Sequence, residues 1–275
     1  MRDGTKGILV IIGGAEDKTG DCVILKQAPQ LLAPDDRLVI LTTATEHPEQ
    51  VGAEYTLVFR RLGVENTSAL NINTRRDADD EAMCSAIRQA RCIFMTGGDQ
   101  LRITSILGGT AASQALQNLY ASGGIIMGTS AGASVMSSTM VVQGNDDAPA
   151  RKCTLKMAPG LGFMENAIID QHFDQRGRFG RLLCGVAENP GVLGIGIDED
   201  TAIKVHPDGQ FEVIGSNAVT IIDGRSIHSS NVSELKPDEL LAIVGVTVHA
   251  LPAGYGYDMV KREALRLKQD EPGDR

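Results

Sequence analysis

Short runs of apolar residues, most of them closed by a glycine or a polar turn, constrain the fold of this chain more than any other feature. In most of these runs the apolar residues are continuous and do not alternate with polar ones. Continuous runs of this length are typical of strands buried on both faces of a parallel sheet. The predicted strands are Ile8–Ile12, Leu38–Thr42, Ala69–Ile72, Cys92–Met95, Ile125–Met127, Ile168–Asp170 and Val192–Ile197.

Amphipathic stretches lie between these runs. Glu49–Leu62 carries apolar residues at nearly helical spacing and is followed by Gly63, a common helix stop. Asp79–Ala90 opens on acidic residues, which suit the N-terminus of a helix. Further helices are predicted over Ser113–Ser122 and Arg178–Glu188. This alternation predicts an α/β fold with an open, mostly parallel sheet flanked by helices.

The last third of the chain has a different pattern, with strand pairs around short polar turns. The predicted elements are a hairpin of Ala202–His206 and Phe211–Ile214, a second pair of Ala218–Ile222 and Arg225–His228, a strand Leu240–Val248, a closing helix Tyr257–Lys268 and a polar tail, 269–275. No linker rich in Pro or Ser and no repeat divides the sequence. We therefore expect a single domain over residues 1–275, with an antiparallel C-terminal extension.

Composition and charge narrow the classes of function. The chain has 275 residues, 42% of them hydrophobic, which is enough for one large core. A net charge of −9 without a dense Lys/Arg run argues against nucleic acid or an anionic membrane as a partner. No apolar stretch reaches the length of a membrane span, and Ile8–Ile12 is too short for a signal peptide. The five cysteines are scattered without a CxxC pair, as expected of reduced thiols in a cytoplasmic protein.

The strongest chemical signal is the G-x-S-x-G pattern Gly128–Gly132. It follows the predicted strand Ile125–Met127 and precedes a stretch compatible with a helix. This strand–turn–helix context is the one that a nucleophile elbow requires, because the sharp turn exposes the serine hydroxyl above the sheet. Ser130 is therefore the candidate nucleophile, and an ordinary glycine-rich turn is the alternative.

A serine nucleophile needs a base and a group that orients the base. Of the four histidines beyond Ser130, we favour His172, which follows a predicted strand at the end where ligands bind in open α/β folds. Asp198, Glu199 and Asp200 together end another apolar strand. Alternation does not decide which of these carboxylates points at the histidine, and a solvated acidic turn is the alternative.

Acyl transfer also needs N–H donors for the developing oxyanion. Gly98, after the strand Cys92–Met95, and Ala131, after the serine, are the candidates; a tight turn alone is the alternative for Gly97-Gly98. The pair Gly13-Gly14 lacks the spacing of a dinucleotide or P-loop site. No spacing of His or Cys suggests a metal site, so we expect neither a cofactor nor a metal.

Five segments together resemble the cyanophycinases, a group within the serine peptidase family that also contains aspartyl dipeptidase. They span most of the chain in family order. The segments are Ile11–Lys18, Phe94–Arg102, Gly128–Ala133, Asp170–Phe173 with three spaced arginines, and Gly196–Thr201. The Asp-Gln-His-Phe run with its arginines separates cyanophycinases from their dipeptidase relatives.

The resemblance implies a Ser130–His172–Glu199 triad, and so a specific choice among the three carboxylates. It implies cleavage of the aspartate backbone of cyanophycin with release of β-aspartyl-arginine. The positions that match the family's substrate pocket are Gln100, Asp170, Gln171, Arg176, Arg178 and Arg181. The region Gln143–Met157 departs from the family pattern. We also expect a homodimer.

The chemistry of the pocket residues suits this substrate, because each repeat of the polymer carries a guanidinium and a free carboxylate. Arg176, Arg178 and Arg181 can bind carboxylates through two parallel hydrogen bonds, and Asp170 can pair with a guanidinium. A solvated helix face is the alternative for the arginines. Two other functions stay open: an α-aspartyl dipeptidase, and a non-catalytic α/β binding protein.

Overall fold

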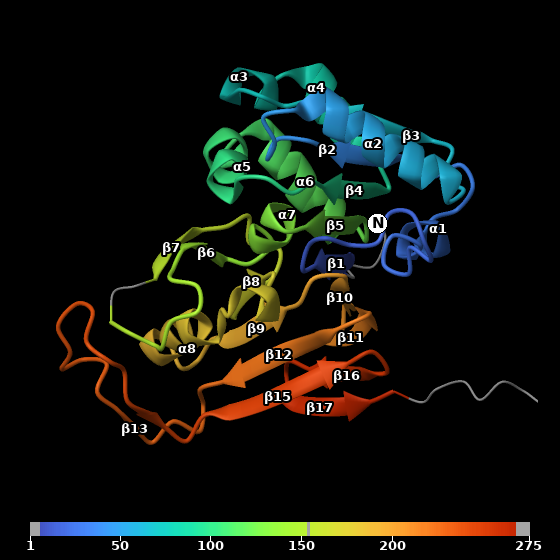
Figure 1. Cartoon of the computed structure of the whole chain (residues 1–275). Helices are drawn as coiled ribbons and strands as arrows, with labels where there is room; N and C mark the ends of the chain where they lie inside the picture. Colours follow the sequence, from blue (N-terminus) through green and yellow to red (C-terminus); the bar gives the residue numbers. More distant parts are fainter. Residues whose placement is uncertain (1–5, 153–154, 268–275) are drawn as a thin grey trace, which may run out of the picture.

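The computed structural model describes residues 6–152 and 155–267 (Figure 1). Within these ranges the largest sheet has nine strands, in the order β17-β16-β11-β10-β1-β5-β4-β2-β3. Five neighbouring strands of this sheet are parallel. They are β1 (Ile8–Ile12), β2 (Leu38–Leu41), β3 (Thr67–Leu70), β4 (Cys92–Met95) and β5 (Ile125–Thr129).

The other four strands extend this sheet in antiparallel fashion beyond β1. They are β10 (Thr201–Val205), β11 (Gln210–Gly215), β16 (Tyr255–Asp258) and β17 (Glu263–Arg266). The pair β10–β11 is the first hairpin that the sequence predicts. The fold class is thus confirmed: parallel strands lie between helices, and antiparallel strands extend the molecule toward its C-terminal part (Figure 1).

A second sheet has the order β15-β12-β9-β8 and lies in the lower half of Figure 1, beside the antiparallel strands of the first sheet. Its strands are β8 (Ala167–Gln171), β9 (Leu193–Ile197), β12 (Ala218–Asp223) and β15 (Thr247–Pro252). Only β8 and β9 are parallel in this sheet. The sequence patterns do not separate it from the first sheet, because a buried strand has the same apolar run in either.

Helices cover both faces of the parallel strands because successive side chains of a strand point to opposite faces. Val10 and Ile12 face α1 (Gln27–Leu31) and α2 (Pro48–Arg61). Leu9 and Ile11 lie in the larger core, which includes α4 (Glu81–Arg88), α5 (Gln100–Leu107), α6 (Ala111–Ala121) and α7 (Ala131–Ser134). The four-residue α3 (Arg75–Ala78) contacts α5. Three of these helices, α1, α3 and α5, were not predicted.

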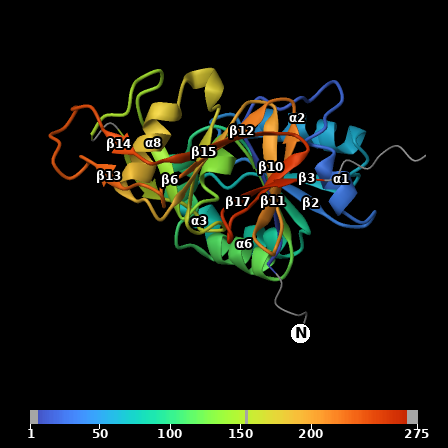
Figure 2. The ribbon, with the colours of Figure 1, turned by 90° about the horizontal axis from the view of Figure 1, so that it is seen from below.

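The second sheet is covered by α8 (Phe179–Glu188), which follows a short 3-10 helix, Asp174–Arg176. Two small antiparallel pairs complete the described elements: β6 (Thr139–Gln143) with β7 (Lys156–Pro159), and β13 (Ser229–Ser230) with β14 (Ile243–Val244). Figure 2 shows β13 and β14 at the same end of the molecule as α8. The segment between them contacts the chain before β7, since Lys152 N–H donates to Glu239 O.

Several predicted elements of the last third are wrong. The sequence 257–268 forms no helix in its described part: it contributes the end of β16, a turn and β17. The side chain of Tyr257 is fully buried and stacks on Phe211 of the neighbouring strand, so strand packing overrides the helical composition. The residues 269–275, predicted as a tail, lie outside the described residues.

One strand pairing and the bounds of two strands also differ. The run 218–222 pairs with β9 and β15 and not with 225–228, because a longer connection returns the chain to the sheet. The predicted strand 240–248 is broken at Gly245, which has φ +92°, into β14 and β15. The strand predicted at 69–72 lies two residues earlier, at Thr67–Leu70. Among the described residues, no helix is long and apolar enough to cross a membrane.

Candidate active site

Ser130 stands in a strained turn between β5 and α7. Its backbone has φ 52° and ψ −109°, a conformation that a non-glycine residue rarely adopts. The turn is also crowded: a Cβ on Gly128 would lie 2.5 Å from the carbonyl oxygen of Gly132, and one on Gly132 would lie 2.3 Å from that of Met95. The two glycines of the G-x-S-x-G pattern are therefore sterically required, and the turn has the form of a nucleophile elbow.

His172 lies beside this serine. It directly follows β8 and also has a positive φ, 46°. Its Nε2 is 2.9 Å from Ser130 Oγ, although the two residues belong to different sheets. The ring packs against the backbone of Gly14, where a Cβ would lie 2.3 Å from the ring's Cε1. Only glycine at position 14 leaves room for the imidazole in this place.

One of the three neighbouring carboxylates reaches the imidazole. Glu199 Oε1 is 2.6 Å from His172 Nδ1. Asp198 turns the other way and accepts hydrogen bonds from the N–H groups of Asp174 and Ala218. Asp200 accepts from the Asp17 N–H and the Ser216 hydroxyl. Because a carboxylate can only accept, Nδ1 carries the proton and a neutral imidazole offers the lone pair of Nε2 to the serine.

Two residues that the sequence analysis did not identify form hydrogen bonds with the backbone of Glu199. The Gln175 side-chain oxygen accepts the Glu199 N–H at 2.9 Å, and the Asn217 amide donates to the Glu199 carbonyl at 2.8 Å. Gln175 lies three residues after the candidate base and two residues after the end of the Asp-Gln-His-Phe run. That proximity is a usable signal, whereas the position of Asn217, in the turn between β11 and β12, gives none.

Burial lowers the pKa of the His172 imidazole below its ordinary value. The hydrogen bond to Glu199 opposes this shift, and the positive charges of Arg176 and Arg178 add to it. The lowered pKa favours the neutral imidazole at neutral pH, which is the form that can accept a proton from the serine.

The predicted oxyanion donors border the same hydroxyl. A Cβ on Gly97 would lie 3.4 Å from Ser130 Cβ, so the loop before α5 runs beside the nucleophile. Gly98 has φ +141° and could not carry a Cβ, which would lie 2.2 Å from the Ala44 carbonyl oxygen. Ala131 is the first residue of α7. Among the described hydrogen bonds, neither the Gly98 nor the Ala131 N–H has an acceptor.

Comparison with known proteins gives the family. Residues 9–214 match the model of peptidase family S51. The chain belongs to this family. It is 34% identical over 261 residues to a cyanophycinase from Synechococcus elongatus, covering 94% of this chain and 81% of that protein. It is 33% identical over 263 residues to a cyanophycinase from Trichormus variabilis, covering 95% and 88%.

A solved structure supports the fold of this S51 peptidase. A peptidase from an acI-B1 Actinobacterium superposes with a TM-score of 0.65 and 23% identity, covering 94% of this chain and 99% of that one. Membership of the family makes the chain a serine-type peptidase, as the sequence resemblance implies. Among the described residues, no group of three or more His, Cys, Asp or Glu side chains is arranged to hold a metal ion.

Next to the hydrogen-bonded chain of Ser130, His172 and Glu199 lies a group of buried charges. Asp170, in β8, is completely buried and binds Arg181 through both oxygens, one of them 2.6 Å from Arg181 Nε. Arg178 Nη1 is 3.5 Å from Asp170 and 2.9 Å from the side-chain oxygen of Gln171. The family resemblance predicts Asp170, Gln171, Arg178 and Arg181 as part of a substrate pocket. The structure brings them together, with 5% of Arg178 and 7% of Arg181 exposed.

A fifth member of this group was not predicted. Asp146 lies in the loop after β6, within the region that departs from the family pattern. Its Oδ1 is 3.1 Å from Arg178 Nε and 3.0 Å from Arg181 Nη1. Its side chain is 40% exposed, so the loop brings a carboxylate from the solvent side onto the buried arginines. The sequence gives no signal for this contact, because a loop position shows nothing of its distant partners.

The remaining predicted pocket residues are placed differently. Arg176 is exposed, in the 3-10 helix after His172, and makes no ion pair in the described part of the chain. The Gln100 amide donates to the carbonyl oxygens of Val141 and Val142 at 3.1 and 3.3 Å. Gln100 thereby ties the N-terminus of α5 to β6, the strand that leads into the Asp146 loop.

Proposed function

We propose that this S51 peptidase hydrolyses the aspartate backbone of cyanophycin, with Ser130, His172 and Glu199 as its catalytic triad. The observation that carries the proposal is the chain of two hydrogen bonds, 2.9 and 2.6 Å long, from the serine through the imidazole to the glutamate. The chain that holds it is similar to cyanophycinases over 81% and 88% of their length. Such a constellation is recognised by geometry and roles.

In the proposed reaction, each of these groups has one task. His172 Nε2 takes the proton of the Ser130 hydroxyl as Oγ forms a bond with the scissile carbonyl carbon. The carbonyl oxygen becomes an oxyanion and accepts hydrogen bonds from the N–H groups of Gly98 and Ala131. Glu199 stabilises the imidazolium that has formed and keeps its orientation.

The tetrahedral intermediate then collapses. The carbon–nitrogen bond breaks, and the imidazolium gives its proton to the leaving amine, which leaves an ester on Ser130. In the second half, His172 takes a proton from water, the hydroxide attacks the ester carbon, and the carbon–Oγ bond breaks. The proton returns to Oγ, so the enzyme is unchanged and one water is consumed.

The buried arginines supply the substrate specificity in this proposal. A carboxylate of the polymer would replace Asp146 on Arg178 and Arg181, which keeps two cations facing two anions. Gln100, Asp170, Gln171 and the exposed Arg176 complete the pocket. Asp170 orients the two arginines, and Arg176 meets the polymer at the surface.

An assay with three substrates tests this proposal. Initial rates are compared on cyanophycin, on α-linked polyaspartate and on short α-Asp dipeptides. We expect a preference for cyanophycin over polyaspartate of roughly 10⁴-fold, because a site with buried polar groups rejects a substrate that leaves them unpaired. Equal rates on cyanophycin and polyaspartate would contradict the pocket. Faster hydrolysis of the dipeptides would support the alternative, an α-aspartyl dipeptidase.

The proposal also includes a single domain, a cytoplasmic location and a homodimer. Both sheets contribute to one core, through Ile11 and Ile126 on one side and Ile169 and Ile195 on the other, which supports a single domain. Cys22, Cys84 and Cys92 are buried free thiols, which supports a cytoplasmic protein; Cys153 lies outside the described residues. We propose a homodimer as well, which light scattering of the purified protein tests.

A further inference from the structure

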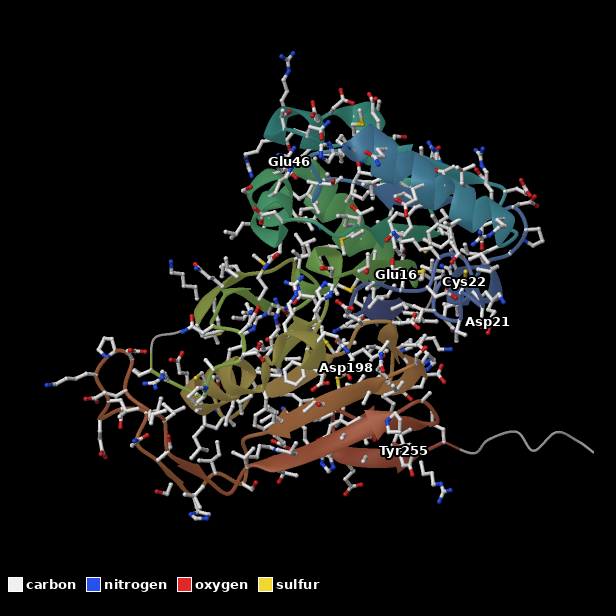
Figure 3. The ribbon with its side chains drawn as sticks, in the orientation of Figure 1. Glu16, Asp21, Cys22, Glu46, Asp198 and Tyr255 are labelled. Carbon is white, nitrogen blue, oxygen red and sulfur yellow. The ribbon has the colours of Figure 1, made fainter. Side chains whose placement is uncertain are left out.

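A buried carboxylate, Glu16, lies behind the nucleophile and has no part in the chemistry above. Its side chain is 4% exposed, and Figure 3 labels it at the middle of the molecule, near β1 and β5. One carboxylate oxygen accepts a hydrogen bond of 2.6 Å from the Thr129 hydroxyl, and the other accepts one of 2.5 Å from the Tyr55 hydroxyl. Thr129 is the residue that immediately precedes Ser130.

The loop that ends at Glu16 contacts the nucleophile and the base. Where β1 ends, the Ile12 carbonyl accepts the Ser130 N–H at 3.1 Å. The next carbonyl, of Gly13, accepts the His172 N–H at 2.8 Å. The imidazole then packs on Gly14. The two candidate triad members, which follow strands of different sheets, are thus held by three consecutive residues: Ile12, at the end of β1, and Gly13 and Gly14 after it.

The same loop contacts the segment of the third member. The Gly14 carbonyl accepts the N–H of Asp200, the residue after Glu199, at 2.9 Å. One residue after Glu16, the Asp17 N–H donates to the Asp200 carboxylate at 2.9 Å. The loop 12–17 therefore touches the backbone of every segment that carries a triad residue.

We infer that Glu16 is a positioning residue, which fastens the loop 12–17 to Thr129 and so keeps Ser130 Oγ at its working distance from His172. The inference rests on the proposed triad. Ser130 is held at φ 52°, and a strained residue keeps such a conformation only where its surroundings enforce it. The Thr129 side chain supplies one restraint directly before the strained residue, and the Ile12 carbonyl supplies another on Ser130 itself.

Stability alone gives no reason for a carboxylate in this place. In the described part of the chain the donors to Glu16 are two hydroxyl groups, with no ion pair. An apolar side chain of similar size would avoid the desolvation of a charge. Burial, together with the neighbouring Glu16, raises the pKa of Tyr55, so this hydroxyl remains a donor. The result is two short, charge-assisted hydrogen bonds with fixed directions, which suit positioning.

Two matched variants test the inference. Thr129→Val and Tyr55→Phe each remove one hydroxyl from the same carboxylate and preserve the shape of the side chain. We expect both to lower the thermal midpoint. Only Thr129→Val should slow the labelling of Ser130 by a fluorophosphonate and lower kcat on cyanophycin, by about 10- to 100-fold, with KM unchanged, because small misplacements of a reacting group have effects of this size. Thr129→Ser, which keeps the hydroxyl, should restore the labelling rate.

Equal losses of labelling in Thr129→Val and Tyr55→Phe would overturn the inference, because Glu16 would then act through stability alone. A wild-type labelling rate in a folded Thr129→Val would overturn it too. Either result leaves the triad intact, provided that Ser130→Ala abolishes labelling. Labelling that persists in Ser130→Ala would instead contradict the triad, and the inference with it.

Discussion

Two regions border Ser130, and they are held in place by different interactions. On one side, the loop 12–17 and the elbow are fixed by backbone hydrogen bonds and by glycines that no larger residue could replace. On the other side, Arg178 and Arg181 are fixed by ion pairs with Asp170 and with Asp146, a half-exposed carboxylate from a loop.

The two kinds of interaction suit two different tasks, the chemical step and substrate binding. Several backbone contacts restrain the strained backbones of Ser130 and His172, so the hydrogen-bond geometry of the proposed triad is set without substrate. The half-exposed Asp146 carboxylate can be exchanged for a ligand of the same charge, because the buried arginines then keep an anionic partner. Changes on the first side should therefore affect the chemical step, and changes on the second should affect substrate binding.

The largest effect is expected at the nucleophile itself. Ser130→Ala should lower kcat by about 10⁶-fold and leave the thermal midpoint near that of wild type, because a half-buried hydroxyl is lost without a cavity. Turnover of cyanophycin and thermal unfolding measure the two quantities. A variant that keeps a tenth of the wild-type activity would place the chemistry on another residue.

The next effect separates the three neighbouring carboxylates. Glu199→Gln should lower kcat by about 10⁴-fold, because an amide can neither stabilise the imidazolium nor enforce the correct tautomer. Asp198→Asn and Asp200→Asn should act mainly on the thermal midpoint, since both side chains bind backbone N–H groups and not the imidazole. Steady-state kinetics of the three variants decides: the largest fall in kcat in Asp198→Asn would mean that the third member is misassigned.

A smaller effect, this time an improvement, is expected for substrate binding when Asp146 is changed. Asp146→Asn should lower KM for cyanophycin by about 3- to 10-fold with kcat unchanged, because the substrate carboxylate no longer displaces a charged side chain from the arginines. Asp147→Asn, at the neighbouring exposed position, is the matched control and should leave KM as it is. A higher KM in Asp146→Asn would show that Asp146 contacts the substrate and does not compete with it.

The smallest expected effect is a shift in the pH dependence of kcat/KM. On the acid side, kcat/KM falls as His172 takes up a proton, and because burial lowers its pKa the midpoint of this limb should lie below the ordinary imidazole value of 6.5. The positive charge of Arg176 adds to that lowering, so Arg176→Gln should move the midpoint to higher pH. Added salt screens the exposed charge and should move the wild-type midpoint in the same direction. An unchanged midpoint in Arg176→Gln would remove this residue from the electrostatics of the base.

Much of the catalytic side could be predicted from the sequence because its signals are local. The glycines around Ser130, the apolar run before it and the position of His172 after a second run are all contiguous features. The choice of Glu199 came from family resemblance, because three adjacent carboxylates give no local signal. In the structure, Asp198 and Asp200 face other partners.

The parts that were missed depend on contacts between distant segments. The pairing of β9 with β12 and of β11 with β16 joins segments separated by longer connections, so 257–268 could not be recognised as strands by composition. The partnership of Asp146 with Arg178 spans 32 residues. Likewise, the proximity of Glu16 to Thr129 spans 113 residues and follows only from the adjacency of β1 and β5.

The masses of the soluble products released from purified cyanophycin test the central claim most directly. If Ser130 cleaves the polymer backbone beside a pocket that recognises its charged side chains, wild-type protein should release β-aspartyl-arginine dipeptides, and Ser130→Ala should release none. Free arginine as the main product would mean cleavage of the side-chain amide instead. That result, or equal release by wild type and Ser130→Ala, would contradict the account.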